Sequence, residues 1–271
     1  MVNFFFHADD YGRSKLISKN IANCIEANII SSISIIVSDK IFGLDYIKKK
    51  KIRKRLHLNL TDFPPNVNGV MDKKYSFVGL LLSPLLGNFQ KKKFDITQEV
   101  IRQINIFKSN FDLKSIEIDS HQHVHMIPWI FNILYDLKDK YQINFIRIPD
   151  EKILCYQSLI TNFKFLFNFL KLFLIKFFII INYKKIKTLN NKIHFNGIIF
   201  SSCPNDKIIK KIIEKSKNLK FKSEILLHPG FSSESEKGQF EKFFFRFYSS
   251  PLRKKEYQFC LNLKKYFKKN E

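Results

Sequence analysis

Cysteine is scarce in this chain of 271 residues, and the four cysteines lie far apart, at Cys24, Cys155, Cys203 and Cys260. No two of them form a CxxC pair, which argues against a zinc ribbon, a dithiol redox centre and a disulfide framework. Unpaired cysteines suit a reducing compartment. We therefore expect a cytoplasmic protein with an ordinary hydrophobic core, for which 45% hydrophobic residues are sufficient.

A secretory signal is also missing from the first residues, MVNFFFHADDYG. Their apolar run is only a few residues long, no positive charge precedes it, and acidic residues follow at once. This pattern agrees with the cytoplasmic location expected from the cysteines.

Acidic residues are few, 24 against 47 lysines and arginines, which gives a formal net charge of +23. Such a charge attracts polyanions, and a basic protein that binds membranes or nucleic acid is one reading of the chain. However, the basic residues are scattered and no nucleic-acid motif is present. The excess is mostly lysine in a chain also rich in Ile, Asn and Phe, which is typical of a genome-wide compositional bias. We expect no nucleic-acid partner.

Glycine and proline number only eight each, and no linker or internal repeat interrupts the chain. Apolar runs of the buried-strand kind alternate with stretches of helical periodicity over the whole length. This alternation predicts one α/β domain over residues 1–271, a single TIM-barrel-like (β/α) barrel in a distorted form, with about seven strands. Strands are expected at 2–6, 33–37, 56–60, 115–119, 145–148, 197–200 and 224–227, and helices at 14–27, 39–51, 92–110, 128–140, 206–217 and 251–267.

The segment Leu159–Tyr183 is more apolar than the rest, and we expect it to form a helical insert. Lys164, Lys171 and Lys176 interrupt it, and each lysine at the centre of a bilayer costs about 2.5–3.5 kcal/mol, so a spanning helix is disfavoured. A basic, apolar helix often lies in a membrane interface. A barrel helix with a wide buried face and a homodimer contact are the alternatives.

Polar residues follow several expected strands. Asp9 and Asp10 come directly after the first strand, and His228 follows the strand at 224–227. His57 lies on a strand of its own. The most unusual stretch is DSHQHVHMIP, in which Asp119, His121, His123 and His125 alternate and would share one face of an extended chain.

The carboxyl ends of barrel strands converge on one face, where active sites of such folds lie. Asp9, Asp10, His121 and His228 all fall at expected strand ends, Arg147 lies near another, and His57 can reach the same face. Two histidines and a carboxylate can bind a divalent metal ion with a position left open for water. A second carboxylate beside them can act as a base.

The motifs ADDYG, HLNLT, DSHQHVHMIP, RIPDE and LLHPGF, in this order from Ala8 to Phe231, resemble those of the YdjC-like carbohydrate deacetylase family, which includes chitooligosaccharide deacetylase. The resemblance implies a TIM-barrel-like fold and the hydrolysis of N-acetyl groups from an amino sugar or oligosaccharide. It departs at His7, where the family commonly has Asn, and after Gly230, where Phe-Ser-Ser replaces an acidic residue.

The resemblance also implies roles for individual residues. Metal ligands would be Asp10, His57 and His121, holding one divalent ion, Mg²⁺ or Zn²⁺. Asp9 would be the catalytic base and His228 the general acid. The remaining implied residue, Arg147, would line the substrate pocket.

Three further residues are candidates for supporting roles. His123 and His125 would orient metal ligands through hydrogen bonds, or simply pack. Asp119 would hydrogen-bond either a ligand or Arg147.

Two other enzyme readings remain beside soluble carbohydrate deacetylation. A deacetylase that lies on the inner face of the membrane would suit a lipid-linked amino sugar. A metal-dependent phosphoesterase or amidohydrolase on the same fold is disfavoured, because those enzymes tend to carry an HxH pair after the first strand, where this chain has Asp9-Asp10.

Overall fold

The computed structural model describes residues 3–38, 40–62, 75–152, 163–189, 191–202 and 204–266. Its centre is a sheet of seven parallel strands in the order β5-β4-β3-β2-β1-β7-β6. The strands are β1 Phe4–Tyr11, β2 Ile30–Ile35, β3 Arg53–Leu58, β4 Ile116–Ser120, β5 Ile143–Ile146, β6 Ile193–Asn196 and β7 Lys222–Leu227.

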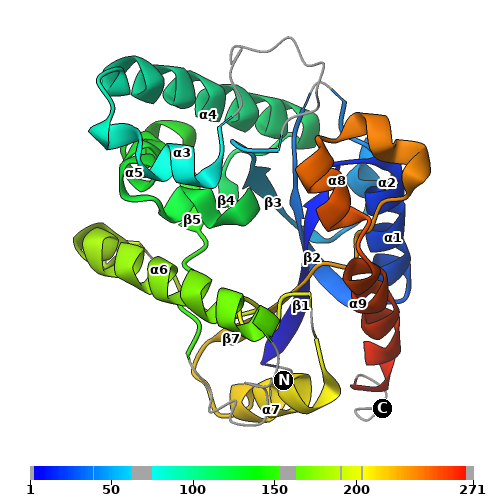
Figure 1. Ribbon diagram of the computed structural model, residues 1–271. Coiled ribbons are helices and arrows are strands. Elements are labelled where there is room, and N and C mark those ends of the chain that lie inside the picture. The colour runs from blue at the N-terminus through cyan, green and yellow to red at the C-terminus, as the bar shows by residue number, and fades with distance from the viewer. Residues whose placement is uncertain are drawn as a thin grey trace.

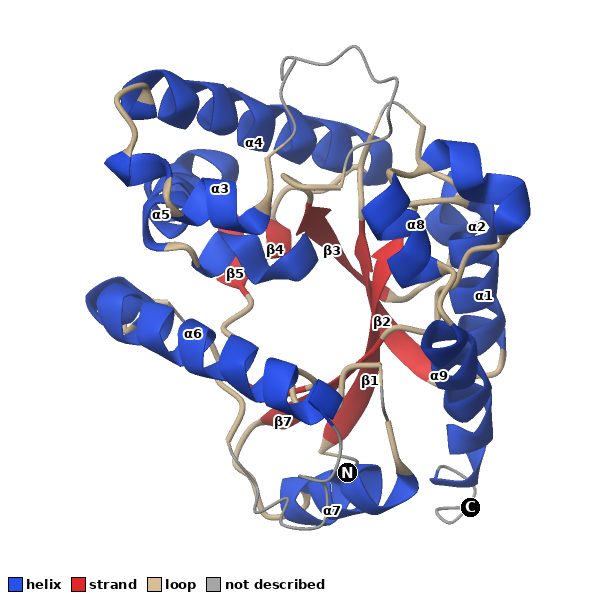
Figure 2. Ribbon diagram, viewed as in Figure 1, coloured by secondary structure: helices blue, strands red, loops and turns tan. Residues whose placement is uncertain are grey.

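Helices cover the outside of this curled sheet (Figures 1 and 2). They are α1 Lys15–Glu26, α2 Leu44–Lys49, α3 Phe77–Leu81, α4 Phe89–Phe111, α5 Pro128–Tyr141, α6 Phe163–Ile186, α7 Asp206–Ser216, α8 Lys242–Tyr248 and α9 Pro251–Asn262. Short 3₁₀ segments are η1 Ser83–Leu85, η2 His121–Met126, η3 Glu234–Gln239 and η4 Leu263–Tyr266. The α/β class with a parallel sheet is therefore confirmed.

The sheet is an open half-barrel, since β5 and β6 are its two edges in the described part of the chain. Helix α6 is the connection between these two edge strands. The distortion expected from the strand count thus has a specific form, a barrel left open between its fifth and sixth strands.

Local sequence signals explain several boundaries. The Ser14 hydroxyl caps α1 by accepting a hydrogen bond from the Ile17 amide at 3.3 Å, as the N-cap pattern predicts. Helix α5 begins at Pro128, where the missing amide hydrogen is tolerated. Strand β1 is a continuous buried run, which is typical of a strand covered by helices on its outer side and by side chains within the barrel.

Two expectations about secondary structure are wrong. The apolar run at 197–200 is not a strand; the strand lies just before it, at Ile193–Asn196, and Gly197 with φ of 154° turns the chain away from the sheet. The helix expected at 39–51 is reduced to Leu44–Lys49 because Gly43, with φ of 77°, precedes it in a left-handed conformation. Asp39, Cys155, Cys203 and residues 159–162 lie outside the described residues.

Helix α6 is long and apolar enough to cross a membrane over Leu166–Ile186, by length and composition alone. One face of it is nevertheless packed on the barrel, with Leu172, Ile175 and Phe178 almost fully buried. The expected helix at 159–183 is therefore present from Phe163 onward, and it serves as a connecting helix of the sheet.

Candidate active site

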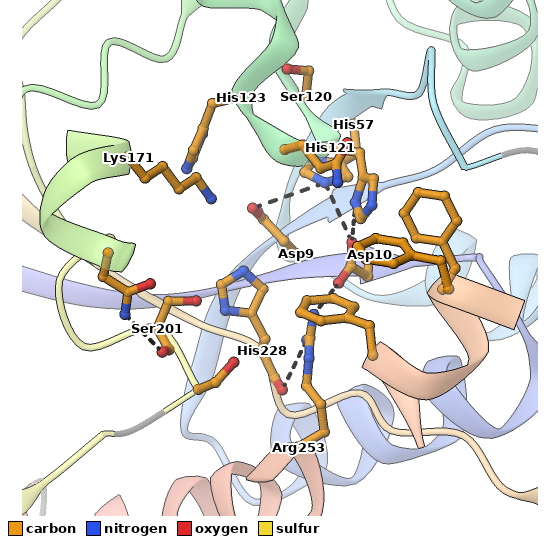
Figure 3. Close-up of a pocket in the computed structure, with 16 residues that line it drawn as sticks. Asp9, Asp10, His57, Ser120, His121, His123, Lys171, Ser201, His228 and Arg253 are labelled. Atoms are coloured by element: carbon orange, nitrogen blue, oxygen red, sulfur yellow. Dashed lines mark hydrogen bonds and ion pairs between the residues drawn. The ribbon is translucent and has the colours of Figure 1, made fainter. Parts of the chain in front are cut away.

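The residues expected at strand ends line one cavity of about 200 Å³. Asp9 and Asp10 come from β1, His57 from β3, and His121 and His228 follow β4 and β7. Figure 3 shows these side chains pointing toward a common centre. The structure thus brings together five candidates that span more than two hundred positions of the chain.

The backbone is unusual at the points where it presents these residues. Asp10 has φ of 72°, and Gln122 and His123 have φ of 55° and 56°. Residues with side chains rarely adopt this left-handed region, and such strain concentrates at functional sites. At His123 the bend interrupts the extended chain, so the alternating residues 119 to 125 do not share one strand face as the sequence suggests.

Asp10, His57 and His121 form a compact cluster. The Asp10 Oδ1 atom lies 3.0 Å from His121 Nδ1 and 3.5 Å from His57 Nε2. On its other side, the His57 Nδ1 atom lies 2.6 Å from Asp119 Oδ1. Asp119 therefore supports His57 from behind, in the manner of carboxylates that orient metal-binding histidines.

This cluster fits a metal ion on physical grounds. With its Nδ1–H donated to Asp119, a neutral His57 presents a lone pair on Nε2 toward the Asp10 carboxylate, and two acceptors so close need a cation or a proton between them. The His121 Nε2 atom is buried and has no hydrogen-bond partner among the described residues. One ligand atom from each of the three residues can lie within 4.8 Å of the others.

The charge around His57 supports the same conclusion. Burial alone would lower the pKa of His57, but the carboxylates of Asp9, Asp10 and Asp119 outweigh burial and raise it to about 10. The cluster therefore attracts positive charge strongly. A divalent cation competes with protons for such ligands.

Asp9 is held by an arginine at the back of the cavity. Arg147 donates through Nη1 and Nη2 to the two Asp9 oxygens, each at 3.0 Å, and it also lies 2.9 Å from Asp119 and 2.8 Å from Glu224. Burial opposes ionisation of Asp9, but Arg147, His57 and His7 hold its pKa well below the usual range. Asp9 is thus ionised and fixed in position.

The placement of Arg147 differs from the expectation that it lines the substrate pocket. Its side chain is almost fully buried, and it is not among the residues that line the cavity. It lies behind Asp9, so its contacts position a carboxylate. The physical reason is that its Nη1 and Nη2 atoms lie against three buried carboxylates, Asp9, Asp119 and Glu224.

His228 lies at another wall of the cavity, close to Arg253 of α9 (Figure 3). Its amide donates to Glu256 Oε1 at 2.8 Å, and its Nδ1 atom lies 3.6 Å from the same oxygen. Arg253 donates to the His228 carbonyl and to Asp10 Oδ2, each at 3.3 Å. Helix α9 thus connects the candidate acid with the candidate metal ligands.

The other two histidines have different environments. His125 is buried and bridges Ser120 Oγ at 2.5 Å and the Arg147 carbonyl at 2.8 Å. Because a carbonyl only accepts, Nε2 carries the hydrogen, and Nδ1 accepts from Ser120. His125 therefore fixes the loop behind the cavity, whereas His123 lines the cavity and packs edge-on against Phe195.

Asn168, Lys171 and Arg253 line the cavity although the sequence did not suggest them as site residues, and Glu256 contacts His228 from outside the cavity. Asn168 and Lys171 lie on the side of α6 that faces the cavity. Burial lowers the pKa of Lys171 to about 8. Arg253 and Glu256 lie three residues apart in a lysine-rich stretch, and this spacing is equally typical of a solvated helix face, so it does not mark them as site residues.

The buried carboxylates, the histidine pair and the parallel half-barrel agree with one family. A family model described as YdjC-like protein matches residues 3–264. The chain belongs to the YdjC-like family. This confirms the family resemblance that the sequence motifs indicate.

Relatives of this YdjC-like protein carry a functional name. It is 27% identical over 157 residues to a carbohydrate deacetylase of Xenopus laevis, covering 53% of this chain and 49% of that protein. It is 26% identical over 151 residues to a carbohydrate deacetylase of Danio rerio, and the match covers 53% of this chain and 48% of that protein. The chain spans about half the length of the curated relatives it matches.

A solved structure supports the fold. A crystal structure from Enterococcus faecalis V583, of a protein provisionally named for cellobiose-phosphate cleavage, superposes with a TM-score of 0.55. The superposition covers 96% of this chain and 94% of the Enterococcus chain, and the two sequences are 14% identical. At that identity the likeness concerns the arrangement of strands and helices only.

Proposed function

We propose that this YdjC-like protein is a metal-dependent hydrolase that removes the N-acetyl group from an amino sugar or oligosaccharide. The observation that carries the proposal is the cluster of Asp10, His57 and His121 beside the ionised Asp9, all facing one cavity. Relatives named carbohydrate deacetylase support the same chemistry.

Asp10, His57 and His121 would hold one divalent ion. When bound, that ion supplies Lewis-acid polarisation of the amide carbonyl and lowers the pKa of a water molecule. Two imidazoles and a carboxylate suit Zn²⁺, while Mg²⁺ with additional water ligands is the other candidate.

Asp9 is the proposed base. Its carboxylate lines the cavity and is held by both guanidinium nitrogens of Arg147, so that it accepts a proton from the attacking water without rotating. The low pKa that Arg147 imposes makes Asp9 a weak base. The attacking water must therefore be acidified for this transfer to be efficient.

His228 is the proposed acid. An amine cannot leave as an anion, so a proton must reach its nitrogen as the amide bond breaks. His228 lines the cavity, and its amide and ring both lie close to Glu256. These contacts with Glu256 hold the imidazole at the cavity wall, where it can reach a leaving nitrogen.

The proposal is tested by replacing the cluster. Asp10→Ala, His57→Ala and His121→Ala should each lower bound metal and reduce acetate release from N-acetylated oligosaccharides by about a hundredfold or more. Metal content by elemental analysis and acetate by a coupled assay are the two measurements. Wild-type metal content and rate in all three variants would contradict the assignment.

A matched control is His194→Ala. His194 lies on β6 outside the cavity and is partly exposed. Its loss should leave metal content and rate unchanged. Phosphate release from sugar phosphates, measured in parallel, would favour the alternative phosphoesterase reading if it exceeded acetate release.

A further inference from the structure

An exposed apolar face runs along α6. Its members recur at intervals of three and four residues, so they share one side of the helix. They are between 51% and 71% exposed, which is unusual for so many large side chains together. We call this surface the α6 apolar face: Leu166, Leu170, Phe173, Phe177, Ile180 and Ile181.

The opposite side of α6 is fixed to the barrel by specific contacts. Asn168 donates to the carbonyls of Ile199 at 2.9 Å and Ser201 at 3.2 Å, and Asn182 donates to the Met126 carbonyl at 3.0 Å. If α6 inserted across a bilayer, these contacts would be lost. The helix is therefore held with its apolar face outward.

The α6 apolar face adjoins the mouth of the cavity. Asn168 and Lys171, between Leu166 and Phe173 on the same helix, line the cavity on one side. On the other side Phe243 and Phe247 of α8 line it and remain 68% and 37% exposed. Figure 1 shows α6 and α8 on opposite sides of the open barrel. Exposed apolar groups thus border the cavity from two sides.

The sequence around α6 is strongly basic. Residues 152–205 contain eight lysines and no aspartate or glutamate. Lys176 and Lys185 pair with Asp150 and Asp136, but the eight lysines outnumber these two partners. A second copy of the chain docked on the same face would bring two basic regions together, which electrostatic repulsion disfavours. An anionic surface is the complementary partner.

We propose that the α6 apolar face docks on an anionic lipid surface, at the inner face of the membrane. An apolar helix with surrounding lysines binds such surfaces by burying its side chains in the interface while the cations contact the head groups. The cavity mouth then faces the lipid head groups. Resting on the proposed deacetylase function, the substrate is an N-acetylated amino sugar attached to a lipid.

Binding is measured by sedimentation of the full-length protein with vesicles. Vesicles of phosphatidylcholine mixed with phosphatidylglycerol should carry the protein down, and vesicles of phosphatidylcholine alone should carry less. The triple variant Phe173→Ser, Phe177→Ser and Ile180→Ser should bind the anionic vesicles about tenfold or more weakly. None of these three residues lines the cavity.

A matched control removes the same amount of exposed apolar surface elsewhere. Val78→Ser, Leu85→Ser and Phe94→Ser replace three residues that are 60%, 82% and 63% exposed on other elements. This control should keep vesicle binding. Equal loss in both triple variants, or no binding by the wild type, overturns the lipid-surface proposal. The wild type could also form a dimer in solution that the α6 triple variant abolishes and the control variant keeps. That result would assign the α6 apolar face to a second copy of the chain and would overturn the lipid-surface proposal as well.

Activity separates this inference from the proposed function. Acetate release is compared for hexadecyl N-acetylglucosaminide in anionic vesicles and for soluble methyl N-acetylglucosaminide. The α6 triple variant should lose its rate on the vesicle substrate while its rate on the soluble one is unchanged. If the wild type releases acetate from neither substrate, the proposed deacetylase function is wrong, and vesicle binding still tests the docking of the α6 apolar face. If the α6 triple variant loses the same fraction of its rate on both substrates, the proposal that the docked enzyme acts on a lipid-linked substrate is contradicted.

Discussion

His228 and Glu256 form a pair in which one residue acts through the other. Glu256 is fully buried and touches the amide of His228, with the imidazole 3.6 Å away, so its charge orients and supports the ring from outside the cavity. Glu256→Gln keeps an acceptor for the amide and removes the charge. We expect kcat to fall about tenfold, with KM and metal content little changed.

A double-mutant cycle distinguishes this positioning role from a structural one. His228→Ala alone should slow acetate release by about 10²–10⁴-fold, which is typical of a lost general acid. In that background Glu256→Gln should have almost no further effect, because its partner is already gone. Fully additive losses would show that Glu256 acts independently of His228.

Individual site residues were predictable where they follow strands. The convergence of Asp9, Asp10, His121 and His228 on one face was predictable because each falls at an expected strand end, and parallel strands end on the same side of the sheet. Arg253 and Glu256 were not predictable, since charged residues on a lysine-rich helix are usually solvated and nothing local shows that these two face inward. Only the tertiary fold brings α9 against Asp10.

At the scale of elements, the end of β1 depends on one glycine. Gly12 has φ of 90°, and a Cβ there would lie 2.6 Å from the Ile36 carbonyl oxygen. Gly12→Ala should therefore lower the free energy of unfolding by about 2 kcal/mol or more, through the left-handed backbone and the close approach together. Urea denaturation followed by circular dichroism measures the change.

Gly87→Ala is the matched control for that substitution. A Cβ at Gly87 would meet nothing within 4 Å, and its backbone is not left-handed. Its effect should stay within about 0.5 kcal/mol in either direction. Equal effects at the two glycines would contradict the role assigned to the turn after β1.

Long elements were predicted well and short ones poorly. Helix α4 and strand β7 carry periodic or continuous apolar patterns over enough residues to identify them. The run at 197–200 is as apolar as a strand, but it is buried in a turn after β6. Composition alone cannot distinguish a buried turn of this kind from a strand that pairs in the sheet.

At the scale of the whole molecule, the barrel is closed by side chains where its sheet is open. The Glu151 carboxylate, shortly after β5, accepts hydrogen bonds from the amides of Ile198 at 2.7 Å and Ile199 at 3.1 Å, just after β6. Asn191 donates to the Ile146 carbonyl at 2.6 Å across the same opening. These contacts join the two edge strands beneath α6, so the fold depends on polar groups that no strand pattern reveals.

The closure should depend on pH because Glu151 is buried. Burial raises its pKa to about 7, although the amide hydrogen bonds oppose this change. Between the unfolded pKa near 4.5 and pH 7 the folded state holds a proton that the unfolded state has lost, so this contribution to stability is fully present below about 4.5 and lost as pH rises through 7. The loss amounts to about 3 kcal/mol.

The variant Glu151→Gln tests this dependence, because its amide accepts the same hydrogen bonds without titrating. The stability of the wild type relative to Glu151→Gln should therefore decline by about that amount between acidic and mildly alkaline pH, measured by urea unfolding at each pH. A difference that stays constant would show that Glu151 has the same pKa in the folded and unfolded states, which would contradict the closure of the opening between β5 and β6 by a neutral carboxyl.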